Sequence, residues 1–186
     1  MGSLSFDPIA DHYDATRGGE RRGRYVADVL APWLPDAGVV CEIGVGTALV
    51  ASAVADGGTA VVGVDISAAM LALAAPRLPG RLARADASAL PFADSSFDAV
   101  VSVLTHTDLD HPEAAFAEAA RVLRRGGRLS YVGTHPCFVT PFVERRSAGA
   151  HLLHPGYRQR GWHQAGPGFG QGIRPRVGVH HLPLAD

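Results

Sequence analysis

Two glycines stand one residue apart in the stretch CEIGVGTALV, between an apolar run and a segment of small residues. Gly44 and Gly46 leave room for a ligand near the backbone, and a helix that begins here presents free N–H groups. Glu42 lies just before them, where its carboxylate would repel a pyrophosphate but could pair with a cationic amino-acid group. The stretch therefore predicts a ligand-binding turn that accepts a positive charge.

Two further acids end apolar runs downstream of this turn. Asp65 closes AVVGVD, where a carboxylate can accept hydrogen bonds from the vicinal hydroxyls of a ribose. Asp86, followed by Ala87, could accept a hydrogen bond from the exocyclic amine of adenine. Each acid also has a plain structural alternative, since aspartate caps helices and forms turns. Asp65 fits any adenosine ligand and does not by itself decide between them.

His106 is the candidate general base, because histidine titrates near neutral pH and this one follows the apolar run FDAVVSVL. A loop histidine that bonds neighbouring backbone is the alternative. Five more histidines occur near the C-terminus: His151, His154, His163, His180 and His181. No HExxH motif, CxxC motif or facial carboxylate accompanies them, so we predict no metal site.

The elements that carry these residues alternate between strand and helix patterns. Short apolar runs predict strands over residues 38–43, 60–65, 81–85, 97–104 and 128–133. Helical spacing predicts helices over residues 20–34, 47–55, 67–75 and 110–123. In the first of these, one apolar face is expected to consist of Tyr25, Val26, Val29, Leu30, Trp33 and Leu34. The third begins at the capping residue Ser67, the fourth begins with capping-box spacing from Asp110 to Glu113, and Gly126–Gly127 should stop it. This order predicts an α/β, Rossmann-like, doubly wound parallel sheet, whose ligands bind at the carboxyl ends of the strands.

Composition narrows the class of protein. The chain has 186 residues, 47% hydrophobic and 19% charged, with a net charge of −1. A neutral globular chain of this kind argues against nucleic-acid or membrane-surface binding by bulk electrostatics. We see no signal peptide and no bilayer-spanning run, and Cys41 and Cys137 are expected to be free thiols. These features predict a cytoplasmic protein.

Taken together, five motifs in order resemble class I S-adenosylmethionine-dependent methyltransferases, and the most similar branch includes quinone-biosynthesis enzymes that act on small molecules. The motifs are Glu42–Thr47, Asp65–Ser67, Asp86–Ala87, LPF at 90–92 with SFD at 96–98, and RVLRRGGRL at 121–129. The N-terminal FDPIADHYDATR resembles the segment that folds over the cofactor in that family. The resemblance covers residues 6 to about 133. It implies methyl transfer (EC 2.1.1) from S-adenosylmethionine to a small organic acceptor, with S-adenosylhomocysteine as product.

The resemblance also implies a place around the cofactor for each motif residue. Glu42, Gly44, Val45 and Gly46 face the methionine part; Asp65 binds the ribose; Ile66 and Met70 lie beside the adenine; Asp86 and Ala87 take its edge; Leu104 and Thr105 lie near the sulfonium; Tyr13 covers the cofactor. Ala48 departs from the family, which often has a third glycine there. Methyl transfer from a sulfonium needs orientation and no protein nucleophile.

Two alternatives stay open beside this interpretation. A nucleotide-dependent oxidoreductase would use a related turn, but its third glycine would fall on Leu49 and Glu42 would repel its pyrophosphate. A non-catalytic or inactive cofactor-binding module of the same fold would carry the same motifs. Cofactor titration and a methyl-transfer assay separate the three.

The C-terminal stretch breaks the alternating pattern. Residues 1–133 are expected to form the cover segment and cofactor-binding core, and residues 134–186 a Gly-, Pro- and His-rich lid or insertion that ends at the start of a final helix. We find no candidate for the last antiparallel hairpin of the family fold. The strand at 128–133 would then be an exposed edge, which a shortened chain, a natural deletion or a homodimer partner could explain.

Overall fold

The computed structural model describes residues 6–133, 141–169 and 177–181. The chain divides into two compact units. The core unit comprises residues 6–105 and 111–132, and the tail unit comprises residues 106–110 and the described residues from 133 onward.

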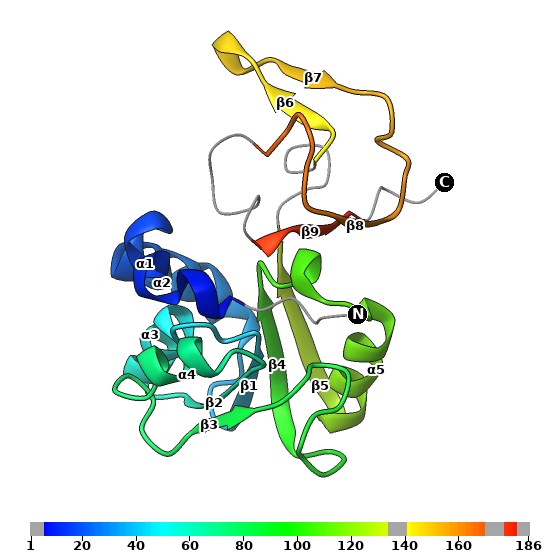
Figure 1. Cartoon of the computed structure of the whole chain (residues 1–186). Helices are drawn as coiled ribbons and strands as arrows, with labels where there is room; N and C mark the ends of the chain where they lie inside the picture. The colour runs from blue at the N-terminus through cyan, green and yellow to red at the C-terminus, as the bar shows by residue number, and fades with distance from the viewer. Residues whose placement is uncertain (1–5, 134–140, 170–176, 182–186) are drawn as a thin grey trace. The chain divides into compact units, whose positions relative to one another are not determined.

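The core unit is built on one five-stranded parallel sheet in the order β3-β2-β1-β4-β5 (Figure 1). The strands are β1 (Val39–Ile43), β2 (Ala60–Asp65), β3 (Leu82–Arg84), β4 (Phe97–Val103) and β5 (Leu123–Val132). The helices are η1 (Asp7–Ile9), α1 (Ala10–Thr16), α2 (Gly19–Leu30), η2 (Ala31–Trp33), α3 (Leu49–Asp56), α4 (Ala68–Ala74) and α5 (Pro112–Val122). The predicted Rossmann-like α/β fold is confirmed.

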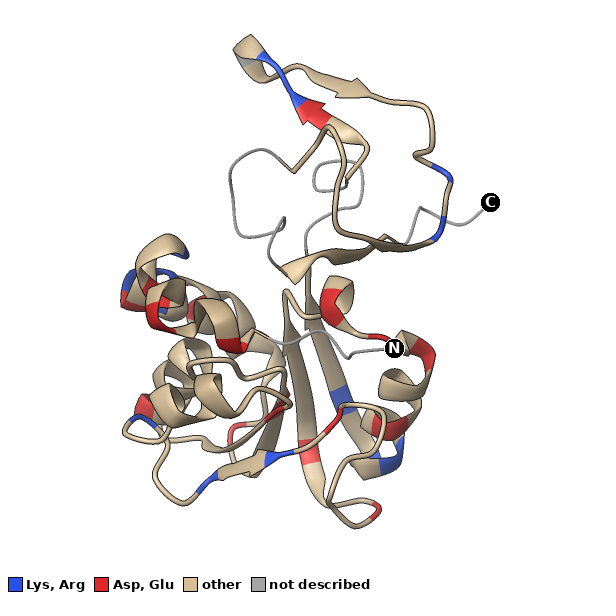
Figure 2. Cartoon of the chain, in the orientation of Figure 1, with Lys and Arg blue, Asp and Glu red and all other residues tan. Residues whose placement is uncertain are grey.

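Helices cover both faces of this sheet, which explains why its strands are apolar throughout. On β1, Val40 packs into the cluster under α2 and α3, while the next residue, Cys41, packs into the cluster under α5. Cys41 is a buried free thiol, and Cys137 lies outside the described residues. The ribbon of α2 carries both acidic and basic positions (Figure 2), in keeping with the near-zero net charge.

The buried face of α2 differs from the predicted one. Tyr25 is 69% exposed and Trp33 57%, whereas Gly23 and Leu30 are buried. The reason is a close approach of two helices, because a Cβ on Gly23 would lie 2.5 Å from the carbonyl oxygen of Leu49. The helix therefore turns its glycine, and not Tyr25, toward α3.

The boundaries of α5 also differ from the prediction. Its N-cap is His111 with no side-chain cap, so the capping box expected at Asp110 is wrong. The Asp110 carboxylate instead bonds His180 Nε2 at 2.8 Å. At the other end, α5 stops at Val122 and β5 begins at once, with a register shift opposite Phe97 and Ala99. Gly126–Gly127 thus lies in an irregular part of β5 and does not end the helix.

The described residues of the tail unit form two small antiparallel pairs of strands. Strands β6 (Val143–Arg145) and β7 (His151–Leu153) form one pair, and β8 (Gly161–His163) and β9 (Val179–His181) form the other. The unit also contains the short helices η3 (His106–Asp108) and η4 (Ser147–Gly149). The expected start of a final helix is wrong at His180 and His181, which lie in β9, and its remaining residues fall outside the described ranges. Within those ranges, no helix combines the length and apolar character needed to cross a membrane.

Candidate functional site

The glycine turn follows β1 and is fixed by backbone bonds, in which Gly44 and Val45 donate to the carbonyl of Val64 at 2.8 and 2.9 Å. Its two glycines serve different purposes. A Cβ on Gly44 (φ +72°) would lie 2.4 Å from the Thr105 side chain, whereas a Cβ on Gly46 (φ +54°) would meet no atom within 4 Å. Gly44 therefore admits Thr105, and Gly46 leaves the open space that a ligand would fill.

A pocket of the core unit opens at this turn. It is lined by Tyr13, Arg17, Gly19, Arg22, Gly23, Val26, Glu42, Gly44, Val45, Gly46, Thr47, Leu49, Val50, Val103 and Leu104. Tyr13, Glu42, the turn and Leu104, all named from the sequence, meet here. The sequence reasoning missed Arg17 and Arg22, although the first stands one helical turn after Tyr13 and could have been found by that spacing. The pocket thus combines a carboxylate with two guanidinium groups.

Glu42 is the buried acidic residue of this pocket, with 4% of its surface exposed. Burial, and then the negative charge of Asp65, raise the pKa of Glu42 to about 8, and a hydrogen bond from the Ala51 backbone opposes the shift. Near pH 7 this environment therefore favours a protonated Glu42. A cationic group bound next to Glu42 would instead favour the ionised carboxylate.

Asp65 connects β2 to the glycine turn. Its Oδ2 accepts from Gly46 N at 2.8 Å and its Oδ1 from Ser67 N at 2.9 Å. Burial raises the pKa of Asp65, and these two bonds lower it by less. Ser67 itself caps α4 by accepting from Met70 N at 3.1 Å, as predicted. Glu42 and Asp65 therefore lie at the same turn, and the negative charge of Asp65 acts on Glu42.

The residues expected around the adenine follow β2 and β3. Met70 is buried, and the Ile66 carbonyl accepts from Arg84 Nε at 3.1 Å. Asp86 Oδ1 accepts from the backbone and hydroxyl of Ser88 at 2.8 and 2.7 Å, which is the local turn foreseen as its alternative role. Ala87 packs against the core cluster under α5.

Two non-glycine residues of the site adopt left-handed backbone conformations. Leu104 has φ +57° and donates its N–H to Val132 O at 2.7 Å, which holds it in the pocket wall. Ala48 has φ +62° and is fully buried. The departure from a third glycine therefore keeps the backbone shape that glycine favours, at a cost of about 1 kcal/mol.

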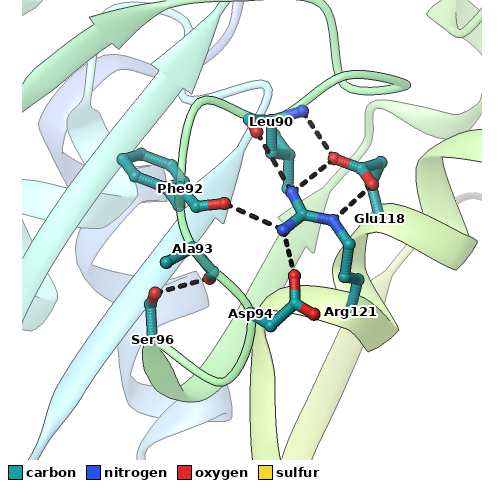
Figure 3. A network of polar contacts seen from close by, with 7 residues as sticks. All are labelled: Leu90, Phe92, Ala93, Asp94, Ser96, Glu118 and Arg121. Carbon is teal, nitrogen blue, oxygen red and sulfur yellow. Dashed lines mark hydrogen bonds and ion pairs between the residues drawn. The ribbon is translucent and has the colours of Figure 1, made fainter.

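The LPF motif is held by Arg121 of α5 (Figure 3). Its guanidinium bonds both Glu118 oxygens at 2.6 and 2.7 Å, Asp94 at 2.7 Å, and the carbonyls of Leu90 and Phe92 at 3.1 and 2.9 Å. Glu118 also accepts from Leu90 N at 2.8 Å. These bonds to Arg121 lower the pKa of Glu118 to about 2. This motif therefore fixes the loop before β4 and not the pocket.

His106 begins η3 in the tail unit and is not among the residues that line the pocket. In the same unit, His154 bonds Glu144 at 3.0 Å, and His181 bonds the carbonyl of Tyr157 at 2.6 Å. Over residues 6–133, 141–169 and 177–181, histidine, cysteine and acidic side chains form no group of three or more that could hold a metal ion.

Known proteins match the part of the chain that carries this geometry. Residues 41–131 match the family model of the methyltransferase domain. The demethylmenaquinone methyltransferase of Renibacterium salmoninarum is 36% identical over 140 residues, which cover 72% of this chain and 59% of the relative. A solved S-adenosylmethionine-dependent methyltransferase from Thermotoga maritima is 32% identical with a TM-score of 0.58, covering 67% of this chain and 57% of that one. Another from Mesorhizobium loti, at 23% identity, shares the fold with a TM-score of 0.66 over 84% of this chain and 74% of that one.

The chain therefore carries a class I S-adenosylmethionine-dependent methyltransferase domain. The curated relatives that it resembles within that class include demethylmenaquinone methyltransferases. The chain spans about 59% of the length of the Renibacterium relative. These relatives are methyltransferases and give no support to an oxidoreductase. S-adenosylmethionine is the cofactor of the class, and the open space at Gly46 beside two carboxylates fits it.

Proposed function

We propose that this protein transfers a methyl group from S-adenosylmethionine to a small organic acceptor. The observation that carries the proposal is the meeting of Glu42 and Asp65 at the open Gly46 turn. In this assignment Glu42 pairs with the cofactor's ammonium group, and Asp65 accepts from its ribose hydroxyls. Arg17 and Arg22, which line the same pocket, supply positive charge for the cofactor's carboxylate. The cofactor brings the reactive methyl group, and the protein orients it toward the acceptor.

The first acceptor class to test is a demethylated quinone ring, because the curated relatives are demethylmenaquinone methyltransferases. We propose residues 134–186 as a lid or insertion, and His106 as the base if the acceptor must lose a proton. His106 follows β4 almost directly, at the end of the strand where ligands of such sheets bind. Asp86, Ala87, Ile66 and Met70 remain the proposed adenine contacts.

We further propose that the protein works in the cytoplasm and pairs with a second copy through β5. Cys41 is a free thiol, in keeping with a reducing compartment. Strand β5 is the last strand of the sheet, and Leu129 and Tyr131 on it are 36% and 42% exposed. An apolar sheet edge of this kind favours association.

Asp65→Ala tests the cofactor assignment. We expect the affinity for S-adenosylmethionine to fall about 10- to 100-fold, because charge-assisted bonds to the ribose contribute about 1.5–3 kcal/mol each. The affinity is measured by calorimetry, with Asp56→Asn at the exposed end of α3 as the control. Unchanged affinity in Asp65→Ala would refute the assignment.

A methyl-transfer assay over quinone-type and other small acceptors then tests the activity itself, and binding without turnover of any acceptor would favour the non-catalytic alternative.

A further inference from the structure

We propose that Asp7, Asp14 and Arg77 are positioning residues that anchor the N-terminal segment at the cofactor pocket and thereby set cofactor affinity. The segment is residues 6–17, from η1 to the end of α1. The inference rests on the proposed function in taking this pocket as the cofactor site. The anchors themselves are independent of that assignment.

The first anchor connects three parts of the chain, which are α1, the glycine turn and the segment that follows α4. Arg77 Nη2 donates to Asp14 Oδ2 at 2.8 Å, and its Nη1 donates to the Thr47 carbonyl at 2.8 Å. The Thr47 hydroxyl donates to the other Asp14 oxygen at 2.5 Å. Both oxygens of one carboxylate and both ends of one guanidinium are thus engaged across three parts of the chain. The Asp14 and Arg77 side chains are 31% and 29% exposed, so water screens the pair only in part.

The second anchor lies beside the ribose carboxylate. Asp7 Oδ1 accepts from the Ser67 hydroxyl at 2.5 Å and from Ala69 N at 3.0 Å. The backbone N–H of Ser67 donates in turn to Asp65. Asp7 therefore attaches the start of the segment to the residue that holds Asp65 in place.

The segment forms part of the pocket wall through Tyr13, which lies between Asp7 and Asp14, and through Arg17, which follows Asp14. Ile9 and Ala10 are 3% exposed each, so the segment is packed between its two anchors. Tyr13 and Arg17 line the pocket together with Thr47, and the Arg17 guanidinium lies 5.9 Å from the Tyr13 ring centre. Because Thr47 belongs to both the glycine turn and the first anchor, the wall and the turn are fixed by the same contacts. Loss of the anchor should release the wall and leave Glu42 and Asp65 in the sheet.

The test compares calorimetric affinities for S-adenosylhomocysteine. Arg77→Met and Asp14→Asn should each bind about tenfold more weakly than the wild type, and the double variant should lose less than the product of the two single losses, since the two changes share the Arg77–Asp14 interaction. Arg77→Lys keeps the positive charge but loses the planar guanidinium that bonds two partners at once. Its affinity should therefore lie between those of the wild type and Arg77→Met. The control is Arg24→Met, which breaks the exposed Arg24–Glu20 pair on α2, 3.9 Å apart, and should bind like the wild type.

Amide hydrogen exchange of the ligand-free protein gives a second readout. Arg77→Met should raise exchange over residues 10–17 and leave β1 and β2 protected. Wild-type affinity in Arg77→Met and Asp14→Asn would overturn the proposal, as would unchanged exchange over residues 10–17 or a rise that extends through β1. If the wild type itself binds no cofactor, the proposed function fails, while the exchange experiment still decides whether the anchors hold the segment.

Discussion

Glu42 is the residue on which the cofactor assignment depends most. A carboxylate with 4% exposure beside a second carboxylate is unfavourable when ionised, and its pKa near 8 expresses that cost. An ammonium group in the pocket would favour the ionised form. Binding of a cationic ligand should therefore drive a proton off Glu42.

This coupling makes cofactor affinity depend on pH. Because the folded, ligand-free protein keeps the Glu42 proton below about pH 8, affinity for S-adenosylmethionine should rise about tenfold per pH unit from pH 6 and level off near pH 8. Calorimetry in two buffers of different ionisation enthalpy should detect close to one proton released near pH 7. Glu42→Gln should remove both the release and the pH dependence. A wild-type affinity that does not change between pH 6 and pH 8 would contradict this role.

Most of the pocket residues that could be predicted from the sequence lie at the end of an apolar run. Glu42, Asp65 and the two glycines follow β1 and β2, where the topology of the sheet fixes the place of a side chain. Arg17, Arg22 and Arg77 were missed because a scattered arginine in a sequence is more often solvated than bound to a partner. The partners of Arg77, Asp14 and Thr47, also lie far from it along the chain. Their roles depend on tertiary contacts that no local pattern contains.

Among the elements, the strands were predicted best because helices cover both faces of the sheet and make each strand an apolar run. The buried face of α2 was predicted wrongly because a glycine adds no signal to a pattern of hydrophobic side chains. Gly23 is nevertheless the residue at which α2 packs against α3. The end of α5 was misjudged because Gly126, with φ +82°, looked like a helix stop. In both cases the deciding feature was a close approach or a bulge that involves distant residues.

The contact between α5 and the LPF loop gives a prediction at the element scale. Arg121→Met should lower the thermal unfolding midpoint at neutral pH, because it removes the bonds to Glu118, Asp94 and two carbonyls. The folded-state pKa of Glu118 is depressed from 4.5 to about 2, so its stabilisation is complete above about pH 4.5 and is lost as the pH falls toward 2.

The difference in midpoint between wild type and Arg121→Met should accordingly narrow as the pH is lowered from 5 to 3. Arg24→Met, which breaks an exposed pair, serves as the control and should show little difference at any pH. A gap that stays constant over this range would mean that Glu118 does not carry the interaction.

In the whole molecule, the core unit follows from the sequence and the tail unit does not. The tail is built from short strand pairs and from contacts between histidine and aromatic rings. The ring centre of Phe142, for example, lies 4.9 Å from that of His163 and 5.3 Å from that of His181. Such contacts have no periodicity in the sequence, so the helix expected near His180 was wrong. Burial lowers the pKa of His181, which shows that this ring lies in a small core and not on the surface.

The sheet edge provides the prediction at this scale. Among the described residues no strand pairs with the outer side of β5, and we expect light scattering to give twice the 19.4 kDa chain mass. Tyr131→Lys should shift the protein toward monomer by placing charge beside the edge. Tyr25→Lys on the exposed side of α2 is the matched control and should leave the dimer intact. A wild-type monomer would remove the proposal.

The central claim is that one ligand contacts the turn after β1 and the acid after β2 at the same time. Amide hydrogen exchange with and without S-adenosylhomocysteine measures this directly. We predict slower exchange in the bound state at residues 44–48 and 65–67 together, with β3 and α5 unchanged in their central residues. Protection at one of these segments without the other, or no protection at saturating ligand, would contradict the account.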